Sequence, residues 1–276
     1  MRIELEGCHV DHRQAVHRFH PRSLRPGDGA ADLRALCAGS GGESVEARAA
    51  IGARSGGGHR CGDACAGSKI AGANTHRATD LNQPMLDHAR TRMSDDPRII
   101  WQQADAQALP FEDARFDAVV CQFGAMFFPD RVGAYGQARR MMRPGGHFLF
   151  NVWGAIEDNE FAEEVTRALG HFFPADPPRF MARTPHGYHD ADAIRADLHA
   201  AGFRDITIEP LDAVSAASSP YEAAAAYCQG TPLRAEIEAR GVSLEEATRY
   251  VANALGKRFG EGSVSGRIRA LVVEAA

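Results

Sequence analysis

The chain has 276 residues, of which 44% are hydrophobic and 24% are charged, and its formal net charge is −5. A chain of this length can form one large domain or a domain with a subdomain. The acidic balance argues against a nucleic-acid partner, and no apolar run approaches the roughly 18 residues of a membrane span. The N-terminal stretch MRIELEGCHVDHRQ has no apolar core like that of a signal peptide, so we expect a cytoplasmic protein.

Residues 1–76 are predicted to be irregular. Large apolar residues make up about a sixth of this segment, and Phe19 is its only aromatic residue. That is too little apolar surface to offset the conformational entropy of folding. Cys61 and Cys65 lie here near two histidines, but their spacing fits no standard zinc pattern, and we predict no metal site.

The same segment has the composition of a GC-rich gene read in the wrong frame, with an excess of Arg, Gly, Ala and Cys. Read one base later with permitted codon choices, residues 54–69 become EAAAGTGVVTRALAA, which holds an acidic residue, a GTG turn and a helix start. In frame, residues 56–58 are three glycines about 20 residues before Asp80, but no apolar strand precedes them. We therefore hypothesise that residues 1–76 are out of frame; a disordered tail is the alternative.

From Arg77 onward, strands and helices alternate. The predicted elements are a short strand ending at Asp80, a helix over residues 84–93, strands over 98–104 and 116–123, a helix over 130–143, a Pro-Gly-Gly turn and a strand over 147–153. Alternation of this kind predicts a parallel sheet with right-handed crossovers. The near-continuous apolar run FDAVVCQF is typical of a strand that is covered on both faces.

The pattern changes after Gly154. We predict helices over residues 159–173 and 190–201, a strand over 203–209, a mostly helical insertion at about 220–260 and a last strand over 267–274. Within the insertion, the sequence SLEE from Ser243 reads as a capping box, in which the serine side chain would bond to a backbone N–H of the helix.

Polar residues follow three of the predicted parallel strands. Asp80 ends the second strand, Asp105 follows the third, and Gln122 and Phe123 end the fourth. Cofactors of doubly wound folds bind at the carboxyl ends of the strands. A carboxylate there offers only hydrogen-bond acceptors, which suits ribose hydroxyls after the second strand and an adenine amino group after the third. Taken singly, each acid is better explained as a helix cap or a solvated loop residue, and the spacing of the strand ends carries the argument for a site.

The ordered set ATDLNQPMLDHA, QQADAQALPFEDARFDAVVCQFGAMFFPD and ARRMMRPGGHFLFNVW resembles a class I S-adenosylmethionine-dependent methyltransferase, in the branch of the ubiquinone/menaquinone C-methyltransferases. The resemblance implies a doubly wound, mostly parallel, seven-stranded α/β sheet of order 3-2-1-4-5-7-6, with strand seven antiparallel and a helical insertion before the last strand. Residues 77–276 would form this domain, while its first strand and glycine-rich loop are missing in frame. The residues it implies for binding S-adenosyl-L-methionine are Asp80, Met85, Asp105, Ala106, Gln122 and Phe123.

The acceptor implied by this resemblance is a small molecule, and aromatic residues such as Trp153 suggest that it is apolar or aromatic. No catalytic residue is assigned. His186 and His189 lie in a loop where a general base could stand, whereas His147 lies in a buried strand and is expected to be structural. Two alternatives stay open: an NAD-type Rossmann oxidoreductase, and a non-catalytic or unfolded remnant of a methyltransferase.

Overall fold

The computed structural model describes residues 50–55, 75–92, 97 and 99–276. Its strands are, in chain order, β1 (Ala50–Ser55), β2 (Thr75–Asp80), β3 (Ile99–Gln103), β4 (Phe116–Gln122), β5 (Met142–Trp153), β6 (Ile206–Ala217) and β7 (Val264–Ala275). Its helices are α3 (Gln83–Arg92), η2 (Ala125–Phe127), α4 (Arg131–Met141), η3 (Ile156–Asp158), α5 (Glu160–Phe172), α6 (Phe180–Arg183), α7 (Ala191–Ala200), α8 (Pro220–Cys228), α9 (Leu233–Glu238) and α10 (Leu244–Phe259).

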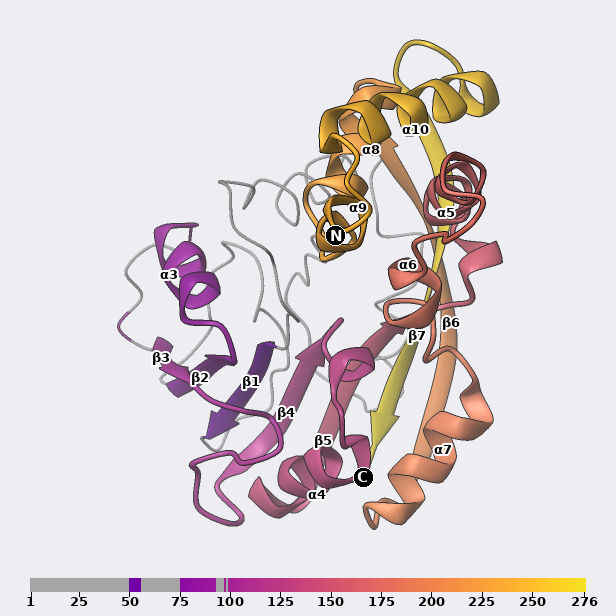
Figure 1. Cartoon of the computed structure of the whole chain (residues 1–276). Coiled ribbons are helices and arrows are strands. Elements are labelled where there is room, and N and C mark those ends of the chain that lie inside the picture. The colour runs from indigo at the N-terminus through magenta and orange to yellow at the C-terminus, as the bar shows by residue number, and fades with distance from the viewer. Residues whose placement is uncertain (1–49, 56–74, 93–96, 98) are drawn as a thin grey trace.

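The described strands form one seven-stranded sheet of order β3-β2-β1-β4-β5-β7-β6, which is the predicted order (Figure 1). Strands β2, β3, β4, β5 and β6 run in one direction, and β7 runs antiparallel to both of its neighbours, as predicted. The sheet is therefore an α/β sheet whose strands mostly share one direction. The helical insertion also lies where it was expected, as α8, α9 and α10 between β6 and β7.

Strand β1 departs from the expectation. A strand does occupy the centre of the sheet, within the segment predicted to be irregular, but it runs antiparallel to both β2 and β4. Ala50 pairs with Gln122 at one edge of the sheet, and Ser55 pairs with Thr75 at the other. The carboxyl end of β1 thus lies at the edge opposite to the carboxyl ends of β2 and β4.

Local sequence explains where helix α4 begins and how the chain passes from α4 into strand β5. Asp130 caps α4, accepting a hydrogen bond from the N–H of Gly133 at 2.9 Å. After α4, Gly145 has a φ of 77°, in the left-handed region that favours glycine. The Pro-Gly-Gly segment interrupts the ladder with β4, so that Phe116 pairs with Met142 but Ala118 pairs with His147. The predicted capping box is wrong: Ser243 is the N-cap of α10, but its side chain makes no capping hydrogen bond.

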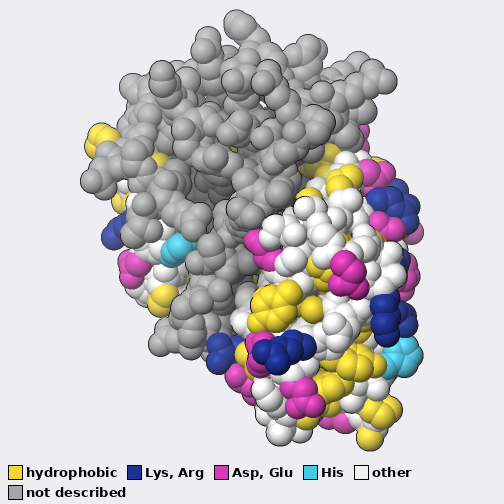
Figure 2. Space-filling model, turned by 90° about the horizontal axis from the view of Figure 1, so that it is seen from above, with side chains coloured by type: hydrophobic (Ala, Val, Ile, Leu, Met, Phe, Trp, Pro, Cys, Tyr) yellow, Lys and Arg dark blue, Asp and Glu magenta, His cyan; other side chains and the backbone are white. Residues whose placement is uncertain are grey.

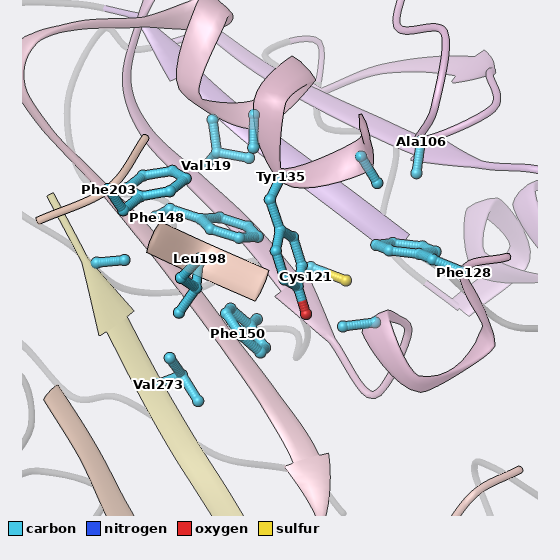
Figure 3. Packing of buried hydrophobic residues seen from close by; sticks show 14 of the residues in the cluster. Ala106, Val119, Cys121, Phe128, Tyr135, Phe148, Phe150, Leu198, Phe203 and Val273 are labelled. Atoms are coloured by element: carbon cyan, nitrogen blue, oxygen red, sulfur yellow. The ribbon is translucent and has the colours of Figure 1, made fainter. Parts of the chain in front are cut away.

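A first hydrophobic cluster, the sheet core, packs β4 and β5 against α4 and α7. Figure 3 shows Tyr135 of α4 standing between Phe148, Phe150 and Cys121. The Tyr135 ring stacks on Phe150 with centroids 5.2 Å apart, and its hydroxyl donates to Tyr188 at 3.3 Å. This packing fixes the two central strands, and with them the positions of their carboxyl ends.

A second cluster, the cap core, lies within the helical cap, by which we mean α5, α6, α8, α9 and α10. It includes Phe161, Leu255 and Val264, and Phe127 of η2 packs against both cores. In Figure 1, α8 and α10 stand at the top of the molecule, on the side to which β4 and β5 point. Figure 2 looks down on this side and shows Lys or Arg side chains intermingled with Asp or Glu on the coloured residues.

The strands β6 and β7 join the two cores. The ladder of β5 with β7 ends at the pair Trp153 and Ala270, whereas β6 and β7 stay paired as far as Ala217 and Val264. Residues 264–269 and 212–217 therefore form a two-stranded ribbon that extends about 20 Å past the end of β5. Strand β6 is longer than predicted because of this ribbon. None of the described helices is long and apolar enough to cross a membrane.

Candidate functional site

Asp80 and Asp105 come together at one corner of the sheet. Asp80 is the last residue of β2 and pairs with Gln103, the last residue of β3, and the Asp80 carbonyl accepts from the N–H of Ala104 at 3.1 Å. Asp80 is only 5% exposed, and its Oδ1 accepts from the N–H of Asn82 at 2.8 Å. Half-buried Asp105 accepts in the same way from the N–H of Gln107 at 2.9 Å. Each acid thus closes a tight turn at the end of its strand.

Ala106 presents a backbone donor beside these acids. The N–H groups of Gln107 and Ala108 bond back to Asp105, whereas the Ala106 N–H has no hydrogen-bond partner among the described residues. The Ala106 side chain belongs to the sheet core, which holds the turn in place. Met85 lies half-buried in α3, whose first turn is closed by a 3.0 Å bond from its N–H to the Asn82 carbonyl.

Phe123 follows β4 in an unusual conformation. Its φ is 49°, a left-handed value that bulky residues rarely adopt. Asn151 holds it there: the Phe123 N–H donates to Asn151 Oδ1 at 2.8 Å and lies 3.2 Å from the Asn151 carbonyl oxygen. The Phe123 ring stacks on Trp153, at the end of β5, with centroids 4.1 Å apart and planes at 20°. Half-buried Gln122 lies beside this pair, opposite Asn151.

The acid corner and the aromatic pair lie on the same edge of the sheet, separated by β1. Ile51 of β1 pairs with Thr79 on one side and Cys121 on the other, which places Asp80 and Gln122 at the same level. Two strand spacings separate them, about 10 Å. The structure therefore brings the predicted residues of three strands into one row, with Met85 in the helix that follows β2.

The glycine-rich loop expected between these two groups is not supplied by the end of β1. That strand begins rather than ends at this edge, so its reversed direction puts Ser55 at the far side of the sheet. The three glycines of residues 56–58, the cysteines Cys61 and Cys65 and most of the segment expected to be out of frame lie outside the described residues.

Cys121 lies at the end of β4 but is no candidate nucleophile. Its side chain is fully buried, and burial raises the pKa of its thiol to about 12, although the N–H groups of Gly124 and Ala125 donate to it. The charge of Asp80 acts in the same upward direction on this pKa, as expected of a carboxylate nearby. The Cys121 thiol is therefore part of the hydrophobic sheet core.

The two histidines of the α6–α7 loop differ in position. His186 is 4% exposed, with Nδ1 2.9 Å from the Gly154 carbonyl oxygen and its ring 6.1 Å from that of Trp153. Burial lowers the pKa of His186 to about 4. His189 is exposed, and its Nδ1 lies 2.7 Å from the His186 carbonyl oxygen. Only His186 therefore adjoins the aromatic pair.

His147 forms an ion pair within the sheet, consistent with the structural part expected for it. Its Nδ1 lies 2.9 Å from Glu274 Oε1 of β7. Asn151, by contrast, was missed by sequence reasoning, although it is the only polar residue between Phe148 and Trp153 in an otherwise apolar strand. Among the described residues, no group of three His, Cys, Asp or Glu side chains is arranged to hold a metal ion.

Comparisons with known proteins agree with this geometry. The family described as "Methyltransferase domain" matches residues 57–150, from the glycine run to the middle of β5. A ubiquinone/menaquinone biosynthesis C-methyltransferase of Caulobacter sp. (strain K31) is 30% identical over 129 residues, which cover 41% of this chain and 48% of that protein. The protein of the same name from Saccharophagus degradans is 27% identical over 136 residues, covering 45% of this chain and 55% of that protein.

The match spans about half the length of these curated relatives. Among solved structures, the YcgJ protein from Bacillus subtilis is similar over 72% of this chain and 80% of its own, at 17% sequence identity and a TM-score of 0.44. The family match covers all six predicted cofactor residues, five of them at or just after strand ends and Met85 in α3. Residues 57–150, which carry the strand ends of the candidate site, are thus similar to a methyltransferase domain.

Proposed function

We propose that this chain transfers a methyl group from S-adenosyl-L-methionine to a small apolar or aromatic molecule. The observation that carries the proposal is the row of strand ends: Asp80 ends β2, Asp105 follows β3, and Phe123, just after β4, stacks on Trp153 at the end of β5. Of these residues, all but Trp153 lie within the matched segment. The same edge of the sheet receives the ligand in doubly wound folds.

The adenosine half of the cofactor fits the residues present. Asp80 would accept hydrogen bonds from the ribose hydroxyls, and Asp105 from the adenine amino group, since an ionised carboxylate offers only acceptors. The unused N–H of Ala106 would donate to an adenine ring nitrogen. Met85 would pack near the adenine ring. The end of β1 does not supply a loop for the methionine half, because it lies at the other edge of the sheet.

The chemistry makes modest demands on the protein. S-adenosyl-L-methionine, when bound, supplies a methyl group on a positively charged sulfur, which is already a strong electrophile. Gln122, Phe123 and Trp153 would line the space beside that methyl group, align the acceptor and exclude water. We assign no general base, and the burial that lowers the pKa of His186 to about 4 makes it a weak one.

The test is a thermal-shift titration of the whole chain with S-adenosylmethionine and S-adenosylhomocysteine. The proposal expects a saturable rise in melting temperature with both ligands. It also expects Asp80→Asn to reduce the affinity by about tenfold or more, because a hydrogen bond to a charged acceptor is weakened. Asp87→Asn is the matched control, because it removes the same charge from an exposed residue of α3. A shift with NAD alone would favour the oxidoreductase instead.

A second candidate, the non-catalytic remnant, is favoured by the direction of β1. We propose that residues 1–76 are out of frame and that residues 77–276 are the methyltransferase-like domain. The gene's codons test this: they must spell the acidic residue and GTG turn one base later. A chain built from the restored frame should then bind S-adenosylhomocysteine more tightly than the present one. Codons that spell another sequence, or tight binding by the present chain, would contradict the hypothesis.

A further inference from the structure

One polar atom of the buried residue His186, beside the aromatic pair, has no hydrogen-bond partner in the described part of the chain. His186 Nδ1 lies 2.9 Å from the Gly154 carbonyl oxygen, which can only accept, so Nδ1 carries the hydrogen. The ring is neutral near pH 7, because burial lowers its pKa by more than the Gly154 hydrogen bond raises it; His189 and Glu157 have smaller, opposite effects. Nε2 is therefore a hydrogen-bond acceptor, and no hydrogen bond to it occurs among the described residues.

The surroundings of His186 define a flat apolar wall. Phe123 and Trp153 stack at 4.1 Å, and the His186 ring is 6.1 Å from the Trp153 ring, tilted by 39°. Phe123 makes this stack with its backbone in a left-handed conformation, and such conformations persist only where the surrounding structure holds them. Asn151 is 4% exposed and supplies that support. Asn151 thus fixes the wall of Phe123 and Trp153, and the His186 ring, with its unpartnered Nε2, lies next to Trp153.

This inference deepens the proposed function and rests on it for the place of the acceptor molecule. We propose that His186 is a specificity-determining residue that selects flat-ringed acceptors bearing an O–H or N–H group, whose hydrogen reaches Nε2 while the ring lies against Trp153. A ligand that covers Nε2 without offering it a hydrogen shuts the nitrogen off from water, which destabilises the complex, so a site of this kind rejects analogues that lack the hydrogen. His186 acts here by recognition and is not required to remove a proton.

Two related probes measure this selection. Isothermal titration calorimetry of the full chain would compare 2-naphthol with 2-methoxynaphthalene, which has the same ring system without the hydrogen. We expect the naphthol to bind about tenfold more tightly. His186→Asn places an amide donor where Nδ1–H stood and has no acceptor at the position of Nε2, so it should bind both probes alike. His186→Gln places an amide oxygen near the position of Nε2 and should keep the preference.

His189→Asn is the matched control on the same loop, because His189 is exposed, and it should also keep the preference. A preference that survives in His186→Asn, or a folded chain that binds neither probe, would overturn the inference. S-adenosylhomocysteine is titrated into the same samples to separate the two proposals. A normal cofactor signal without a preference for the naphthol would contradict only the role proposed for His186. A missing cofactor signal would count against the proposed function itself.

Discussion

The ion pair between His147 and Glu274 makes the stability of the sheet depend on pH. The two residues lie on adjacent strands β5 and β7, with Nδ1 and Oε1 2.9 Å apart and side chains 25% and 17% exposed. The hydrogen bond to Glu274 is the largest cause that raises the pKa of His147, and partial burial acts in the opposite direction. Protonated His147 is therefore favoured in the folded state over the unfolded state.

Glu274→Gln removes the charge with little change in shape. A fully exposed pair would contribute ~0–1 kcal/mol and a buried charged hydrogen bond ~1.5–3 kcal/mol. For this partly exposed pair we expect a loss of about 1 kcal/mol at pH 6, or about 2–4 °C in melting temperature. Because the folded pKa is raised, the contribution is complete below the unfolded pKa of about 6.5 and is lost as the pH rises through the folded pKa.

The assay is urea unfolding of the chain and of Glu274→Gln between pH 6 and pH 9. The difference in unfolding free energy should shrink towards zero as the pH rises. Glu209→Gln is the control, since Glu209 is exposed on the neighbouring strand β6 and should give a small, flat difference. A difference for Glu274→Gln that is constant with pH, or that grows with pH, would refute the reasoning.

Asp105→Ala should lower the affinity for S-adenosylhomocysteine about tenfold; calorimetry that finds it unchanged would count against the adenine assignment. Gly266→Ala should destabilise the chain by about 1–3 kcal/mol, because its Cβ would stand 3.1 Å from two ring carbons of buried Phe161, and a thermal melt like that of the parent would contradict this. Arg258→Met should cost about 2 kcal/mol in urea unfolding, since buried Glu164 would lose a charged partner at 3.2 Å; no change would mean that Arg167, whose guanidinium lies 2.5 Å from the same carboxylate, suffices.

Two substitutions serve as controls for the stability changes. Gly262→Ala adds the same Cβ where nothing lies within 4 Å, so its melt should match the parent. Arg249→Met breaks a pair with Glu245 whose side chains are 71% and 44% exposed, and such surface pairs contribute ~0–1 kcal/mol.

Sequence reasoning located most elements because apolar runs and turn residues are local signals. The strand order followed from the resemblance, and the polar residues after β2, β3 and β4 do lie on one edge. The direction of β1 was not predictable, since six residues of mixed character carry no signal of how they pair. The predicted strand ended at residue 209, where the alternation of the sequence stops, whereas pairing with β7 continues β6 as far as Ala217.

The site was predictable only in part. Asp80 and Asp105 were found because they follow recognisable strands. The left-handed Phe123, the Asn151 support and the fixed tautomer of His186 depend on contacts between residues 28 and 32 positions apart in the chain, which no local pattern reports. A polar residue inside an apolar strand, such as Asn151, was the one signal that could have pointed to this support.

The pairing of β6 with β7 also couples the unfolding of the sheet core to that of the cap core. The β6–β7 ladder, of which the ribbon is the outer half, runs without a shift from Ile206 and Ala275, in the sheet, to Ala217 and Val264, beside the cap core. Neither core can lose its structure without breaking the backbone hydrogen bonds that hold the other, and Phe127 ties them a second time. We therefore expect the sheet and the cap to melt in one transition, with calorimetric and van't Hoff enthalpies that agree, as in a single cooperative unit.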